Sequence, residues 1–85
     1  MNPRRLLARL VVGHLKNVAF GDALALARAF EFEVARVEGS HHILKRAGIS
    51  EFVNLQNVRG EAKSYQLRQF LRLVERYDLR LRDDR

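Results

Sequence analysis

The sequence predicts an α+β fold in which helices cover one face of a three-stranded antiparallel sheet. Apolar residues recur at helical spacing near both ends of the chain, whereas residues 32–56 contain three short β-type runs separated by turn residues. Connections this short favour an antiparallel meander, because parallel strands need a long crossover. Helices before and after such a meander, in a chain of 85 residues, indicate one small sandwich whose other sheet face is open.

The first helix is expected to begin at Pro3, with Asn2 as its N-cap, and to end near Gly13. Its apolar stripe consists of residues at helical spacing, namely Leu6, Leu7, Leu10 and Val11. A second helix is expected to start at Asp22, whose side chain is a good N-cap. Its apolar face consists of Ala23, Leu26, Ala27 and Phe30.

Three strands are expected after the second helix. Residues 32–37 form the first, and the apolar alternation slips at Val34 and Ala35, which predicts a β-bulge or a twisted strand. Gly39 and Ser40 supply a turn, and a second strand follows over residues 41–46. Residues 47–50 are expected to form another turn, residues 51–56 the third strand and residues 57–63 a loop. The phenylalanines, Phe52 among them, are expected in the core.

The clearest helical pattern lies near the C-terminus. Ser64 is its expected N-cap, and its apolar face consists of Leu67, Phe70, Leu71, Val74 and Tyr77. The sequence is therefore divided into an N-terminal helical extension (1–20), a main domain (21–78) and a charged C-terminal tail (79–85). The tail is expected to fray, although Leu79 and Leu81 have the composition to pack or to add a strand.

The composition favours nucleic acid as a partner. The chain has 16 Lys and Arg residues against 10 Asp and Glu, a net charge of +6, and most of the cations are arginine, which pairs well with phosphate. An acidic protein partner fits the same charge. Cysteine is absent, which excludes disulfides and thiol catalysis and suits a cytoplasmic protein. No apolar run reaches the length of a membrane span, so no membrane partner is expected.

Two adjacent histidines follow the glycine turn. Since neighbouring side chains of a strand point to opposite faces, His41 and His42 cannot both face one ligand. A histidine can give or take a proton near neutral pH, and Gly39 and Ser40 allow a phosphate to approach the backbone closely. Arg36, Lys45 and Arg46 are nearby cations in the sequence. A zinc site is the competing use, but the spacing lacks a His-x-His pair, and no metal or cofactor is expected.

The motif Phe32-x-x-x-Arg36-x-x-Gly39-Ser40-His41-His42-Ile43 resembles the HicA toxins of bacterial type II toxin–antitoxin pairs. The similarity runs from about residue 23 to about residue 77. It implies a fold like that of double-stranded-RNA-binding domains, with helix, three strands and helix, and the activity of an mRNA interferase, a metal-independent endoribonuclease.

The resemblance also implies roles for single residues. The functional histidine of the family corresponds to His41, and Lys63 matches a basic loop before the last family helix, where it would contact the RNA backbone. Many relatives carry a proline and a second histidine near the third strand, where this chain has residues 53–57 without either. A HicB-like antitoxin would cover His41 in a hetero-oligomer, and DNA would be bound only through that antitoxin.

The expected RNA-binding residues are Arg36, Gly39, Ser40, Lys45 and Lys63, with His41 as the catalytic residue. Two other functions are compatible with charge and periodicity alone. One is an RNA-binding domain of similar shape without catalysis, which would recognise phosphates and 2′-hydroxyls. The other is a basic module that binds an acidic protein.

Overall fold

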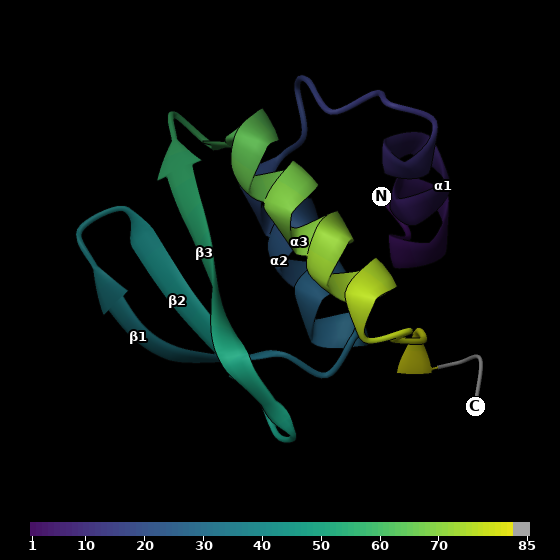
Figure 1. Cartoon of the computed structure of the whole chain (residues 1–85). Coiled ribbons are helices and arrows are strands. Elements are labelled where there is room, and N and C mark those ends of the chain that lie inside the picture. Colours follow the sequence, from purple (N-terminus) through teal and green to yellow (C-terminus); the bar gives the residue numbers. More distant parts are fainter. Residues whose placement is uncertain (83–85) are drawn as a thin grey trace.

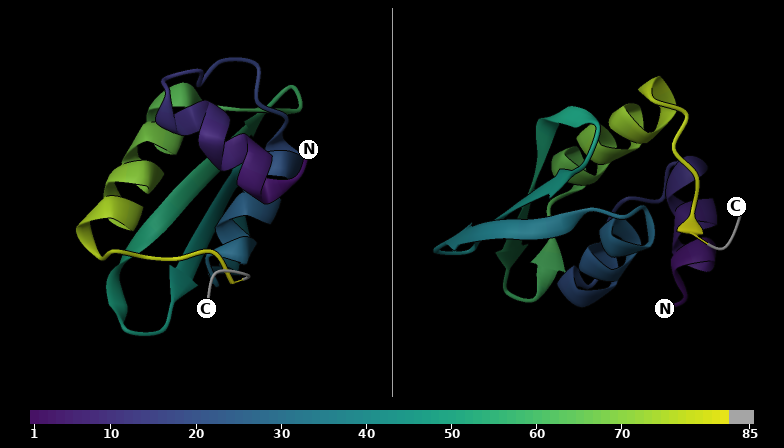
Figure 2. Two further views of the ribbon diagram at one scale, coloured as in Figure 1. Left: turned by 90° about the vertical axis from the view of Figure 1, so that its right-hand side faces the viewer. Right: turned by 90° about the horizontal axis from the view of Figure 1, so that it is seen from below.

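The computed structural model describes residues 1–82 and arranges them in three layers (Figure 1). The helices are α1 (Pro3–Val11), α2 (Phe20–Ala29) and α3 (Ser64–Arg76); the strands are β1 (Glu33–Glu38), β2 (His41–Arg46), β3 (Ile49–Val58) and β4 (Glu61–Ala62). Helices α2 and α3 cover one face of the sheet, and α1 lies on the far side of these two helices (Figure 2). The predicted α+β class with an open sheet face is confirmed.

Helix α1 begins as its sequence predicts. The Asn2 side-chain oxygen accepts hydrogen bonds from the backbone N–H groups of Arg4 (2.8 Å) and Arg5 (3.4 Å), and Pro3 follows at the first helical position. Leu6 and Leu10 are buried. Val11, expected on the same apolar stripe, is exposed at the last position of the helix.

The other two predicted N-caps are wrong. Helix α2 already begins at Phe20, whose N–H donates to the Gly60 carbonyl (2.8 Å) and whose ring is buried, so that Asp22 lies in the first turn. In α3 the cap position belongs to Lys63, and Ser64 is the first helical residue. The Ser64 hydroxyl instead donates to the Leu15 carbonyl (3.0 Å), which ties the start of α3 to the α1–α2 connection.

The sheet has the order β1-β2-β3-β4 with antiparallel neighbours. The register of β1 against β2 shifts between Val34 and Arg36, which confirms the predicted bulge. Strand β3 begins at Ile49 rather than at residue 51, because only residues 47 and 48 are needed for the turn. On the face toward the helices, Leu44 and Val53 are paired and buried.

A fourth strand replaces the loop predicted over residues 57–63. Strand β3 continues to Val58, and Arg59 and Gly60 form a two-residue turn in which both have positive φ (51° and 87°), as type I′ hairpins require. Asn57 then pairs with Ala62, and the Asn57 side chain accepts a hydrogen bond from the Gly60 N–H (2.7 Å). The predicted three-stranded sheet is therefore four-stranded.

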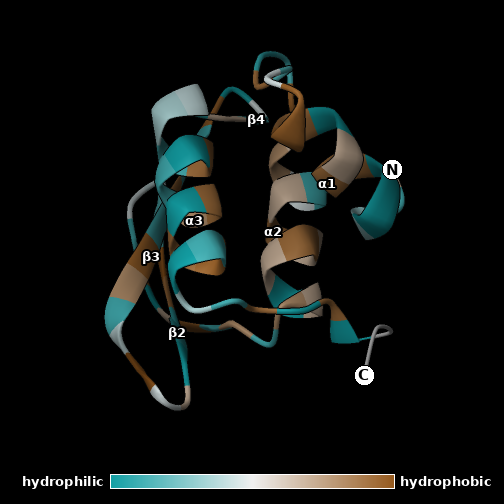
Figure 3. Cartoon of the chain, turned by 45° about the vertical axis from the view of Figure 1, so that its right-hand side comes forward, coloured by the Kyte–Doolittle hydropathy of each residue, from teal (hydrophilic) through white to brown (hydrophobic). Residues whose placement is uncertain are grey.

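The apolar core lies between the sheet and the helices, where the inward faces of the helices are hydrophobic (Figure 3). Phe70 contacts Phe30 and Phe32 edge-to-face, each with ring centroids 5.7 Å apart. In the C-terminal segment, Leu81 is buried and Leu79 partly buried, so residues 79–82 pack on the core where fraying was expected. Residues 83–85 of the predicted tail lie outside the described residues.

Two aromatic residues expected in the core are exposed instead. Phe52 is 64% exposed, because Val53 takes the core-facing position of β3 and the preceding residue must point to the opposite face. Tyr77 is 39% exposed, and its hydroxyl donates to the Glu51 carboxylate (2.5 Å). None of the helices in the described part of the chain has the length and apolar composition needed to span a bilayer.

Candidate functional site

The open face of the sheet carries a short grid of side chains. Cross-strand partners share a face, so the register places the open-face residues in rows across β1, β2 and β3. The first row is Glu38, His41 and Gln56, and the second is Arg36, Ile43 and Asn54. Beyond these rows the β2–β3 register shifts; Lys45, paired with Glu33 on β1, and the exposed Phe52 of β3 lie at this end of the face.

His41 is held on this face by a polar neighbour. Its Nδ1 lies 3.3 Å from the Asn54 side-chain oxygen, one row away on β3. With that oxygen as the acceptor, Nδ1 carries the proton of the neutral ring, and the lone pair is on Nε2. This is the tautomer in which Nε2 can accept a proton from a ligand.

The β1–β2 turn fixes where His41 lies. Glu38 pairs with His41, so Gly39 and Ser40 form a two-residue loop, and Gly39 has φ +61° in the first central position, as in type II′ turns. The Ser40 carbonyl accepts a hydrogen bond from the Asn57 N–H (2.9 Å). The turn is thereby attached to the end of β3.

His42 faces the other way, as strand alternation predicts. Its ring lies against the Phe20 ring, with centroids 4.6 Å apart and planes tilted by 56°. Within the described part of the chain, its buried Nδ1 has no hydrogen-bond partner. His42 therefore belongs to the contact between β2 and α2, and not to the open face.

The cations predicted near His41 are separated by the fold. Arg36 lies in the neighbouring row, where its guanidinium forms an ion pair with Glu38 (3.0 Å). Lys45 is four residues along β2, which corresponds to about 13 Å at the rise of an extended strand. Arg46 is directed away from the open face, and its guanidinium donates to the Phe30 carbonyl (3.1 Å).

Lys63 lies at the junction between β4 and α3. It follows Ala62, the partner of Asn57, with an extended backbone (φ −77°, ψ 133°). The pairing of β4 with β3 ends at Ala62, so no residue of β3 pairs with Lys63. Its ammonium group also lies 5.7 Å from the centre of the Tyr65 ring, within the range of cation–π attraction.

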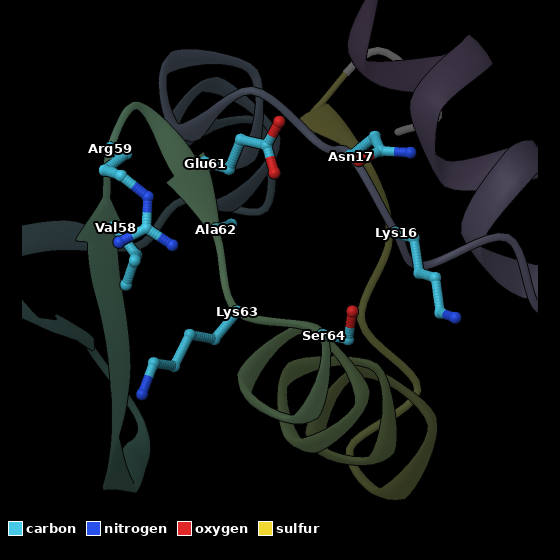
Figure 4. A pocket seen from close by; sticks show the side chains of 8 residues that line it. All are labelled: Lys16, Asn17, Val58, Arg59, Glu61, Ala62, Lys63 and Ser64. Atoms are coloured by element: carbon cyan, nitrogen blue, oxygen red, sulfur yellow. The ribbon is translucent and has the colours of Figure 1, made fainter.

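A basic cavity of about 460 Å³ extends from Lys63. Its charged lining residues are Lys16, Arg59, Lys63 and Glu61, and Ser64 closes it at the start of α3 (Figure 4). The sequence analysis missed Lys16 and Arg59, because the bridge between Ala19 and Glu61 that brings their loops together is not visible as a local pattern.

Gln66 is a further residue that the sequence analysis missed. It is 2% exposed, and its side-chain oxygen accepts a hydrogen bond from the Gln56 N–H (2.7 Å). It thus satisfies the edge of β3 where β4 no longer does, and holds Gln56 beside His41. The sequence feature that could have pointed to Gln66 is its position directly before Leu67, where a polar residue adjoins the apolar face of α3.

Within residues 1–82, no three histidine, aspartate or glutamate side chains are grouped so that they could hold a metal ion. Comparison with protein-family models, with curated proteins and with solved structures finds no match for this chain.

Proposed function

We propose that this chain is a metal-independent endoribonuclease that cleaves mRNA, the toxin of a type II toxin–antitoxin pair. The observation that carries the proposal is His41 on an uncovered sheet face, where its ring contacts Asn54, with Lys63 just past the end of β4, the strand beyond β3. The HicA-like motif around His41 supports it, as does the order of α2, β1, β2, β3 and α3, which matches the helix, three strands and helix of the resemblance except for the two-residue β4 before α3.

In the proposed reaction, Nε2 of His41 takes the proton of a ribose 2′-hydroxyl. The 2′ oxygen then attacks the adjacent phosphorus and forms a 2′,3′-cyclic phosphate, while the bond from phosphorus to the 5′ oxygen breaks. The departing 5′ oxygen takes up a proton from solvent. Lys63 would offset the charge that develops on the phosphate, since a cation held beside that position stabilises the transition state.

The test is cleavage of RNA by purified variants in the presence of a metal chelator. His41→Ala should reduce the rate by at least about 100-fold, the effect of removing one proton-transfer group. His14→Ala is the matched control, because His14 is exposed in the α1–α2 connection, away from the open face. Equal rates for His41→Ala and the wild-type chain would overturn the proposed chemistry.

The basic cavity favours a second candidate function, an RNA-binding domain without catalysis. Lys16, Arg59 and Lys63 can contact phosphates without any role for His41. This function predicts RNA affinity that falls steeply with salt and is unchanged in His41→Ala. Binding of this kind, with no cleavage by the wild-type chain, would replace the first proposal. Binding of an acidic protein but no RNA would support the protein-interaction module.

The proposed partner in the cell is a HicB-like antitoxin that covers His41, in the cytoplasm. Co-expression of the chain with the product of a neighbouring reading frame should restore growth and give a hetero-oligomer on size-exclusion chromatography. Growth arrest that persists in the presence of a bound partner would show that the partner does not cover the active surface.

A further inference from the structure

Phe52 is the largest apolar side chain on the open face of the sheet. It is 64% exposed, although the core-facing positions of β3 are already filled by Val53 and Leu55. Ile43, in the next row of β2, is partly buried beside it. The fold therefore gains little from an aromatic ring at this position, and a ring presented to solvent is available to a ligand.

A hollow of about 210 Å³ lies next to this ring, between β3 and α3. It exists because β4 pairs only with Asn57 and Val58, so that the earlier part of the β3 edge has no neighbouring strand. Phe52 lines the hollow together with the side-chain amides of Asn54 and Gln69. An aromatic ring beside amide groups offers both a stacking surface and hydrogen bonds to the edge of a planar heterocycle.

We propose that Phe52 is the stacking platform for a base of single-stranded RNA, which enters this hollow while the same strand reaches His41. The inference rests on the proposed function for the identity of its ligand. A base inside a duplex is already stacked on its neighbours and cannot lie on the ring, so the substrate class is single-stranded and not double-stranded RNA.

The composition around Phe52 favours RNA over a protein partner. On the open face the apolar part of this region is limited to Phe52 and Ile43, with Asn54 between them. The hollow is also lined by the core residues Val53, Phe70 and Leu73 and by Glu51, whose carboxylate is paired with Arg76. Protein-docking patches are larger and more continuous. The chain is also cationic, with a net charge of +6, and Lys45 lies on the same face of the sheet, paired with Glu33.

The spacing is compatible with one continuous RNA strand. Phe52 lies two rows from His41, about 13 Å along the sheet at the rise of a β-strand. An RNA strand that runs along β2 and β3 would therefore place one base on Phe52, pass over Ile43 and bring a ribose to His41. Binding at Phe52 would then fix which phosphate reaches the histidine.

Phe52→Trp tests the stacking directly, because the chain contains no tryptophan and the introduced indole is the single such fluorophore. The variant is combined with His41→Ala so that the RNA remains intact. We expect a short single-stranded RNA oligonucleotide to quench the indole emission, whereas a duplex of the same sequence leaves it unchanged. Quenching of equal size by the two RNAs would overturn the inference.

An affinity series separates the aromatic ring from its apolar area. In the His41→Ala background, Phe52→Leu should weaken single-stranded RNA binding by roughly 5- to 150-fold, the usual contribution of one stacked base, whereas Phe52→Tyr should retain it. Val12→Ala is the control, because Val12 is similarly exposed (69%) and caps the end of α1, the helix that α2 and α3 separate from the sheet (Figure 2). Thermal unfolding of each variant checks that the fold is unchanged.

The outcomes distinguish this inference from the proposed function. If Phe52→Leu loses affinity while His41→Ala, with Phe52 intact, still cleaves RNA, the platform stands and the catalytic role of His41 fails. If Phe52→Leu binds single-stranded RNA as tightly as the parent while His41 remains essential for cleavage, the platform fails and the proposed function stands. Self-association of the wild-type chain that Phe52→Leu abolishes, with RNA affinity unchanged, would assign the ring to a protein contact and overturn the inference.

Discussion

Replacement of Gln66 by methionine should destabilise the fold through a single backbone group. Gln66 is 2% exposed, and its oxygen lies 2.7 Å from the Gln56 nitrogen. Methionine has a similar length and is apolar, so the packing of α3 is largely retained while the acceptor is lost. The Gln56 N–H is then left without a partner, which costs about 1 to 3 kcal/mol. For a domain of this size, that loss lowers the melting temperature by roughly 4 to 24 °C.

The measurement is urea and thermal unfolding of the Gln66→Met variant, followed by circular dichroism. Gln69→Met is the control, because Gln69 is exposed one turn further along α3, and its free energy of unfolding should stay within about 0.5 kcal/mol of the parent. Amide hydrogen exchange adds a local readout, since the Gln56 N–H should lose protection in Gln66→Met only. If both variants show the same stability and the same Gln56 protection, the hydrogen bond has no role at the β3 edge.

Two further predictions concern the C-terminal half of the chain. The Tyr77 hydroxyl donates to the Glu51 carboxylate and holds the pKa of that carboxyl below its ordinary value. The ionised carboxylate therefore stabilises the fold at neutral pH. This stabilisation is lost as the pH falls through the folded-state pKa of Glu51. Tyr77→Phe should therefore lower the melting temperature most near pH 7, and the difference from the parent should shrink in acid; a difference that grows in acid would contradict this sign. Leu81 is 5% exposed, so Leu81→Ala should lower the free energy of unfolding by about 2 to 5 kcal/mol in urea titrations. Leu79 is only partly buried, so Leu79→Ala should lower the free energy of unfolding by less. Equal losses in the two variants would show that the segment does not pack through Leu81.

Local signals predicted most of the fold. Asn2 and Pro3 carry a start signal that needs no tertiary contact, and the helix begins where they indicate. The parity slip at Val34 and Ala35 is likewise local, and the β1–β2 register shifts there. Strand β2 has the predicted bounds, because it lies between two turns that each contain a glycine.

The remaining errors arise from long-range contacts. Strand β4 is two residues long, too short for a periodic pattern, and exists because Asn57 and Val58 offer it a partner. Helix α2 begins early because the Phe20 N–H finds the Gly60 carbonyl far along the chain. Phe52 was assigned to the core because of its residue type, whereas the strand parity set by Val53 and Leu55 would have placed it on the open face.

The candidate site was predictable only in part. The opposite orientations of His41 and His42 follow from strand geometry, and the structure has them. The cations could not be ranked by sequence distance, because proximity along a strand differs from proximity across a sheet. Lys45, close to His41 in sequence, lies two rows away along β2, whereas Lys63, distant in sequence, lies just past the end of β4.

The hydrogen bond of Gln66 also bears on how this protein avoids aggregation. A bare strand edge is a template on which a second chain can extend the sheet, and β3 has such an edge ahead of its short partner β4. With the Gln56 amide already occupied from α3, an incoming strand would have to displace Gln66 before it could align. The Gln66 side chain thus blocks the addition of a further strand at this position of the β3 edge. Variants that remove this hydrogen bond are therefore expected to form fibrils more readily.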